Sequence, residues 1–195
     1  LDQKKIGRTK LAKEISKVCG RRFEPPMISI IKDRCRIQMS EKPVYRIQFG
    51  VAQHACDNAQ LCGDSYDCFT DGKGRFVAII SDGMGTGGRA AVDGAMASNI
   101  MGNLVKAGLG FDCALKIVNS AMQVKSGEES LATLDVAVLD LFNGSLSVMK
   151  AGAPMSFIKK GRNVERLDAV SVPIGILDEA KFAYAKSTLE ENNWL

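Results

Sequence analysis

The chain has 195 residues, of which 46% are hydrophobic and 25% charged, a composition that indicates a globular domain and excludes an intrinsically disordered chain. No apolar run approaches the roughly 18 residues that a membrane span needs, and the first residues lack the apolar stretch of a signal peptide. The net charge of +4 is uneven, because residues 1–50 carry thirteen Lys and Arg against five Asp and Glu. Aromatic residues do not interleave with these charges, so we expect a solvated helix face and no nucleic-acid surface.

The six cysteines contain no C-x-x-C pair, and three of them are spaced six residues apart, which is not the spacing of a zinc site. We therefore expect reduced thiols of an intracellular protein. The chain begins without an initiator Met, and we expect it to be an excised piece of a longer protein.

The first half of the chain alternates one helical pattern with strand-like runs. Apolar residues recur at helical spacing over residues 6–18, and Gly20 is a plausible stop. The Pro25-Pro26 pair then breaks the chain. The segments expected after it are strands at 27–31 and 44–51, a loop at 54–64, and a buried strand at 76–81, which is apolar on both faces.

The second half begins with two helical patterns, residues 89–106 and a following helix that Asp112 could cap. Strand patterns over 134–142 and 145–150 flank Asn143-Gly144, the strongest short-range signal for a hairpin. A second hairpin is predicted at 156–167, and a last strand at 182–185. Strands, then two adjacent helices, then antiparallel strands indicate an α+β fold.

One glycine-rich segment lies between the buried strand and the first long helix, and it allows two interpretations. Gly83-x-Gly85-x-x-Gly88 matches a dinucleotide-binding fingerprint. Three features oppose that interpretation: Asp82 would lie beside a pyrophosphate, a second helix follows instead of a strand, and no later strand ends in the acidic residue that would hold a ribose.

The other interpretation is a metal site. A carboxylate at the end of a rigid strand, followed by glycines that let backbone carbonyls approach closely, can hold a hard divalent cation. If the segment that begins with Asp64 pairs with the buried strand, Asp64 and Asp82 converge at one end of the sheet. Oxygen ligands alone favour Mg²⁺ or Mn²⁺ over zinc. Taken alone, each of the two acidic sites is better explained as a simple Asp-Gly turn.

Five segments, in order, resemble one known family, the phosphatase domain of stage II sporulation protein E in the metal-dependent (type 2C) protein phosphatase superfamily. The segments are 63–66 (GDSY), 80–90 (ISDGMGTGGRA), 133–136 (TLDV), 152–159 (GAPMSFIK) and 172–176 (VPIGI). The resemblance implies an α-β-β-α sandwich of two antiparallel sheets flanked by helices. It also implies an incomplete phosphatase domain over residues 49–195, preceded at 1–48 by a basic linker or regulatory segment.

The resemblance assigns roles to single residues. It implies that Asp64 is a ligand of a first metal, that Asp82 bridges two metals, and that Gly83 offers its backbone carbonyl. The metals would be manganese or magnesium, with a metal-activated water and no protein nucleophile attacking the phosphorus. Arg89 could contact substrate phosphate or water, or could equally face solvent from the helix. The single histidine, His54, is expected to be a structural or loop contact, and Asp135 to brace the helices.

The family has two further metal-binding Asp residues after the position where this chain ends. We therefore expect a C-terminally truncated domain with weak metal binding, little or no activity, and an exposed sheet edge that favours association. The resemblance implies a protein serine phosphatase that acts on a phosphorylated anti-anti-sigma factor and so controls a sporulation sigma factor. It further implies a homodimer and a cytoplasmic domain attached to the cell membrane in the full-length protein. The alternative is a catalytically inactive phosphatase-like binding or scaffold module.

Overall fold

The structure is a computed structural model that describes residues 7–32, 34–55, 61–125 and 130–195. The chain divides into two compact units, residues 1–46 and 47–195. Within the described ranges, no helix is both long and apolar enough to cross a membrane. The five cysteines that these ranges include are free thiols, and Cys56 lies outside them.

The described part of the first unit contains one helix and one hairpin. Helix α1 (Arg8–Cys19) ends at Gly20, whose φ of 66° gives the left-handed cap that glycine adopts most readily, so the predicted helix and its stop are both confirmed. Strands β1 (Met27–Ile31) and β2 (Arg34–Gln38) pair in antiparallel fashion. Their side chains are mostly exposed, and Ala12 is the one buried residue of α1.

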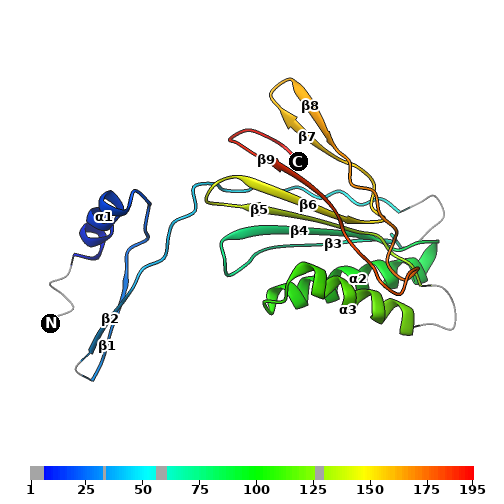
Figure 1. The fold of residues 1–195 in the computed structure, drawn as a ribbon, viewed down its shortest axis with the longest axis horizontal. Coiled ribbons are helices and arrows are strands. Elements are labelled where there is room, and N and C mark those ends of the chain that lie inside the picture. Colours follow the sequence, from blue (N-terminus) through cyan, green and yellow to red (C-terminus); the bar gives the residue numbers. More distant parts are fainter. Residues whose placement is uncertain (1–6, 33, 56–60, 126–129) are drawn as a thin grey trace. The chain divides into compact units, whose positions relative to one another are not determined.

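The second unit is built on a five-stranded antiparallel sheet with the strand order β3-β4-β5-β6-β9 (Figure 1). The strands are β3 (Asp64–Thr70), β4 (Arg75–Asp82), β5 (Leu134–Asp140), β6 (Ser145–Ala151) and β9 (Ala183–Thr188). Adjacent residues of a strand point to opposite faces, so the sheet has two faces of different composition. Val77, Ile79 and Val136 lie on one of them and are fully buried.

Two helices cover that face of the sheet (Figure 1). Helix α2 (Gly87–Lys106) packs on β3 and β4, and helix α3 (Phe111–Val124) packs beside α2. The main hydrophobic core lies between these helices and the sheet and includes Met101, Val118 and Met122. The two predicted helices are confirmed, but Gly110 and not Asp112 is the N-cap of α3.

A second hairpin lies over the other face, formed by β7 (Ser156–Lys160) and β8 (Asn163–Leu167) (Figure 1). Its inward residues Ile158 and Leu167 are buried. Lys159 also exchanges two backbone hydrogen bonds with Trp194, of 2.8 and 3.0 Å, so the second sheet has a neighbour on that side. The α+β fold with antiparallel sheets, expected from the sequence, is therefore confirmed.

Two local predictions were wrong. Residues 44–51 form no strand, because an alternating pattern makes a strand only where a partner strand is available. The β5–β6 hairpin has a four-residue loop, 141–144, and not a two-residue Asn-Gly turn. The Asp140 carboxylate accepts hydrogen bonds from the Phe142 N–H (2.8 Å) and the Asn143 side chain (3.2 Å), and these local bonds end the strand early.

Candidate metal centre

The two acidic residues singled out in the sequence lie opposite each other at one end of the five-stranded sheet. Strands β3 and β4 pair so that Asp64 is the direct partner of Asp82. Directly opposed residues of an antiparallel pair point to the same face, with their Cβ atoms about 4.5–5.5 Å apart. Both side chains are exposed, on the face away from helices α2 and α3. The strand pairing on which the predicted convergence depended is therefore present.

The backbone beside this pair is packed too tightly for any side chain. A Cβ atom at Gly83 would lie 1.9 Å from the carbonyl oxygen of Ala90, in the first turn of α2. A Cβ atom at Gly94, one turn further along, would lie 2.2 Å from the carbonyl oxygen of Gly63. Glycine is thus required where the ends of β3 and β4 meet the helix, and this contact fixes the backbone next to both carboxylates.

The carboxylates also influence each other. Partial burial first, and then the charge and hydrogen bonding of Asp64, raise the pKa of Asp82 above its ordinary value of 3.8. Two carboxylates that share a site in this way disfavour each other's charged form, and a bound cation would relieve that repulsion.

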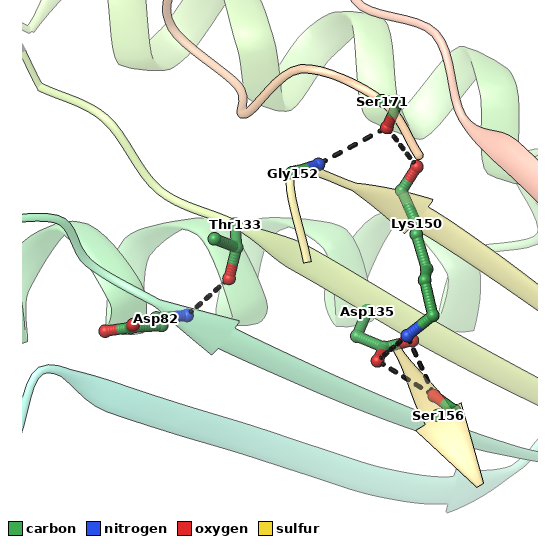
Figure 2. Close-up of polar contacts among 7 residues, drawn as sticks. All are labelled: Asp82, Thr133, Asp135, Lys150, Gly152, Ser156 and Ser171. Atoms are coloured by element: carbon green, nitrogen blue, oxygen red, sulfur yellow. Dashed lines mark hydrogen bonds and ion pairs between the residues drawn. The ribbon is translucent and has the colours of Figure 1, made fainter. Parts of the chain in front are cut away.

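Three residues to which the sequence analysis assigned no role contact the acidic pair. Gln53 donates from its side-chain amide to the Asp64 carbonyl oxygen at 2.8 Å, and the Cys62 thiol lies 3.3 Å from Oδ2 of Asp64. The backbone N–H of Asp82 donates to the Thr133 hydroxyl at 3.0 Å (Figure 2). The contact between Asp82 and Thr133 joins residues 51 positions apart, so no local pattern predicts it.

A buried cation lies two residues further along the same face. Lys150 is fully buried, and its ammonium group contacts the Asp135 carboxylate and, at 2.8 Å, the Ser156 hydroxyl (Figure 2). Ser171 holds the backbone of the same strand, donating to the Lys150 carbonyl oxygen at 2.6 Å. The expectation that Asp135 braces the helices was wrong, because Asp135 points to the opposite face and ties β5 to β6 and β7.

Polar contacts also tie helix α3 to the segment that borders the acidic end. The buried side chain of Asn119 accepts a hydrogen bond from the Gly175 N–H at 2.8 Å and donates to the Leu177 carbonyl oxygen at 2.9 Å. The adjacent Ile174 pairs with Ala132, which in turn forms a bridge with Gly83. The motif at 172–176 therefore supports the backbone next to the acidic pair.

The other residues singled out in the sequence lie around this centre. Arg89 is in the first turn of α2, with an exposed side chain. His54 is exposed, and its backbone carbonyl oxygen lies 3.5 Å from the sulfur of Cys62. Neither arrangement gives the residue a chemical role by itself.

The residues at this end of the sheet fit a hard divalent cation as part of a ligand set. The donors are carboxylate oxygens and nearby backbone carbonyls, and Mg²⁺ and Mn²⁺ prefer such oxygen ligands. Asp64 and Asp82 are the two carboxylates that the structure brings together there. Within the described ranges, no group of three or more His, Cys, Asp or Glu side chains is placed to hold a metal, so water or further ligands would complete the coordination.

The dinucleotide-binding interpretation does not fit the structure. Such a site needs a parallel βαβ unit with the glycine-rich turn between its first strand and its helix. Here β4 pairs with β3 and β5 in antiparallel fashion, and α2 leads into α3. Of the three fingerprint glycines, Gly83 serves the close approach of α2 to the sheet, whereas a Cβ atom at Gly85 would meet no atom within 4 Å and one at Gly88 only a Leu61 carbon at 3.9 Å.

Known proteins resemble the chain in sequence and in fold. The profile of the stage II sporulation protein E (SpoIIE) family matches residues 72–195. Stage II sporulation protein E of Bacillus subtilis is 34% identical over 135 residues, which is 69% of this chain but 16% of that protein. The chain thus spans about a sixth of the length of this relative.

Two solved structures are similar to this chain in fold. The PP2C phosphatase domain of SpoIIE from Bacillus subtilis, with a fragment of its regulatory domain, matches with a TM-score of 0.75 and 25% identity, covering 97% of this chain and 57% of that one. RsbX, solved in complex with magnesium, shares the fold at a TM-score of 0.57 and 18% identity, over 73% of this chain and 68% of that one. With a family profile that covers more than half of its residues, the chain belongs to the stage II sporulation protein E family and has the fold of its PP2C phosphatase domain.

Proposed function

We propose that the chain is the phosphatase part of a metal-dependent protein serine phosphatase. The observation that carries the proposal is the cross-strand pair of Asp64 and Asp82, held at one end of a rigid sheet beside glycines that a helix packs against. Membership of a sporulation family with a phosphatase fold supports hydrolysis of a phosphate ester as the reaction and sporulation as its setting.

In this mechanism Asp64 and Asp82 would hold Mn²⁺ or Mg²⁺, with the Gly83 carbonyl as a further oxygen donor. The metals, when bound, supply Lewis acidity that acidifies water and neutralises charge on the phosphoryl oxygens. The protein contributes position, because the packing of Gly83 against α2 and the pairing of β3 with β4 fix the backbone from which both carboxylates extend. Arg89, in the first turn of α2, is proposed to contact the substrate phosphate.

The proposed substrate is a phosphoserine on an anti-anti-sigma factor, whose dephosphorylation would activate a sporulation sigma factor. We also propose that the full-length protein forms a homodimer and is tethered to the cell membrane, with this domain on the cytoplasmic side. These proposals rest on the family resemblance alone.

Release of phosphate from a phosphoserine anti-anti-sigma protein tests the function. Activity would be measured with and without millimolar Mn²⁺, for this chain and for the full-length natural protein, each with Asp82→Asn as control. We expect manganese-dependent activity in the full-length protein that the substitution abolishes, and little or none in this chain. Activity that persists in Asp82→Asn would refute the proposed site.

The competing function is a catalytically inactive binding or scaffold module. The observation that favours it is that only two carboxylates converge at the site among the residues that the structure describes. Absence of activity in the full-length protein, together with retained binding of the phosphoprotein, would support this alternative.

A further inference from the structure

The hydrogen bonding between β4 and the segment before β5 departs from a regular ladder at the proposed metal ligand. In an antiparallel ladder, every second pair of opposed residues exchanges two backbone hydrogen bonds, and the bond from the Thr133 N–H marks Asp82 and Thr133 as such a pair. Thr133 donates its N–H to the Asp82 carbonyl oxygen at 2.9 Å, as expected. The Asp82 N–H, however, donates to the side-chain hydroxyl of Thr133 at 3.0 Å (Figure 2). A threonine side chain therefore stands where a backbone carbonyl would be.

A second hydroxyl group forms a hydrogen bond with the backbone carbonyl oxygen of Thr133. The hydroxyl of Ser81 donates to that carbonyl oxygen at 2.7 Å, and Ser81 is fully buried. Two residues further on, the Met84 N–H donates to the Leu131 carbonyl oxygen at 2.9 Å, so the two segments stay paired beyond the exchange. The irregularity is thus limited to the pair of Asp82 and Thr133, where two hydroxyl groups satisfy the backbone N–H and carbonyl that are not bonded to each other.

This exchange acts on the residue that would hold the metal. The N–H and the carbonyl of Asp82 flank its Cα, and Thr133 is hydrogen-bonded to both of them. These contacts therefore influence how the carboxylate and the following Asp82–Gly83 peptide are oriented. Backbone packing alone does not fix this orientation, because Asp82 is exposed and bordered by glycine. We propose that Thr133, supported by Ser81, is a positioning residue that orients Asp82 and the Gly83 peptide for metal binding. This inference rests on the proposed function.

The substitution Thr133→Val tests this with little change of shape, because valine keeps the branched side chain and removes the hydroxyl. Thr133→Ser is the matched control, since it keeps the hydroxyl and removes a methyl group. Mn²⁺ affinity would be measured by titration calorimetry in the full-length protein, alongside the Mn²⁺ concentration that gives half-maximal activity. Loss of a group that orients a ligand typically weakens metal affinity about 10–100-fold, and we expect that range for Thr133→Val. Thr133→Ser should stay near the wild-type affinity.

The KM for the phosphoprotein at saturating Mn²⁺ should not change in Thr133→Val, because the residue acts on the metal ligand and not on the substrate. Thermal unfolding without metal checks that each variant folds. Should Thr133→Val fail to fold, Ser81→Ala removes the supporting hydroxyl instead and is expected to weaken Mn²⁺ binding in the same direction.

A Thr133→Val protein that folds and binds Mn²⁺ as tightly as the wild type would overturn the inference, provided that Asp82→Asn loses binding in the same assay. Failure of the proposed function looks different: Asp82→Asn would then bind Mn²⁺ as the wild type does. Equal weakening in Thr133→Val and Thr133→Ser would also overturn the inference, because the methyl group and not the hydroxyl would then matter.

Discussion

At the end of strand β4, Asp82 lies beside a second carboxylate, and the folded protein disfavours its charged form. Partial burial, and then Asp64, raise the pKa of Asp82 above 3.8, so folding costs free energy whenever the group is ionised. This cost is absent below pH 3.8, where both the folded and the unfolded states are protonated. It grows as the pH rises from 3.8 through the raised pKa and is complete above that pKa.

Asp82→Asn should therefore raise the Tm of the metal-free protein at pH 7. The gain should disappear as the pH falls below the ordinary pKa, since no charge is then left to remove. Calorimetry at several pH values measures this, with the exposed Asp178→Asn as a matched control that should not change the Tm. A Tm for Asp82→Asn at or below that of the wild type at pH 7 would show that ionised Asp82 does not destabilise the folded protein.

Lys150 is a buried charge whose partners come from two other strands. Its ammonium group contacts Asp135 on β5 and Ser156 on β7, and its side chain is fully buried. Removing one member of a buried ion pair leaves the other without compensation, which costs about 3–5 kcal/mol. Lys150→Met should lower the free energy of unfolding by that amount in urea denaturation.

Two further variants separate charge from packing at Lys150. The double variant Lys150→Met with Asp135→Leu should recover most of the loss, because apolar pairs of similar volume replace buried ion pairs well. Lys159→Met, on the exposed side of β7, should be close to neutral. A double variant no more stable than Lys150→Met would mean that the lysine stem, not the ion pair, holds the strands together.

At the scale of elements, the contact between α2 and the ends of β3 and β4 sets the geometry of the acidic site. Gly94→Ala places a methyl group 2.2 Å from the carbonyl oxygen of Gly63, which forces the helix away from the sheet. Alanine favours a helix over glycine by up to about 1 kcal/mol, but overpacking of a rigid contact costs about 1–3 kcal/mol. We therefore expect Gly94→Ala to destabilise the domain in urea denaturation and to weaken Mn²⁺ binding.

Gly88→Ala is the control in the same helix, since its nearest neighbour would be a Leu61 methyl carbon 3.9 Å away. It should leave stability unchanged or raise it by up to about 1 kcal/mol. If both alanine variants behave alike, helix propensity and not the close approach governs the position of α2.

Some helices and strands could be predicted from the sequence and others could not. The buried strand, the two long helices and the 156–167 hairpin were predictable because each carries its own apolar period or turn signal. Strand β3, with the polar sequence DSYDCFT, lacks such a signal and is defined by its pairing with β4. The Asp135–Lys150 pair was in principle accessible, because Lys150 shares its strand face with Leu146 and Val148. A two-residue turn, however, would have paired Lys150 with a different residue.

Contacts that join distant segments were not predictable. Thr133 is hydrogen-bonded to the end of β4 and Asn119 to the loop that contains Leu177, in each case more than 50 positions away. A threonine before a strand and an asparagine in a helix have no local signature of such a role. The sequence predicted the convergence of Asp64 and Asp82 only on the condition that β3 and β4 pair, because the two residues lie on different strands.

At the scale of the whole molecule, the main apolar cluster of the described residues lies within the second unit. Every residue of the main core cluster falls between Val77 and Phe182. The first unit buries little, with Ala12 its one buried helical residue. A helix and a two-stranded hairpin without a shared core are marginal in water.

We therefore expect a chain of residues 47–195 to fold alone, with a Tm within about 4 °C of the 1–195 chain, a shift that corresponds to roughly 1–2 kcal/mol or less for a domain of this size. A peptide of residues 1–46 should show little helix by circular dichroism, because one isolated 12-residue helix is below the length that is stable in water. Calorimetry of both chains provides the comparison, and a single cooperative transition is expected for residues 47–195. Loss of that transition when residues 1–46 are removed would mean that the core depends on the first unit, and the chain would then have to be treated as one cooperative domain.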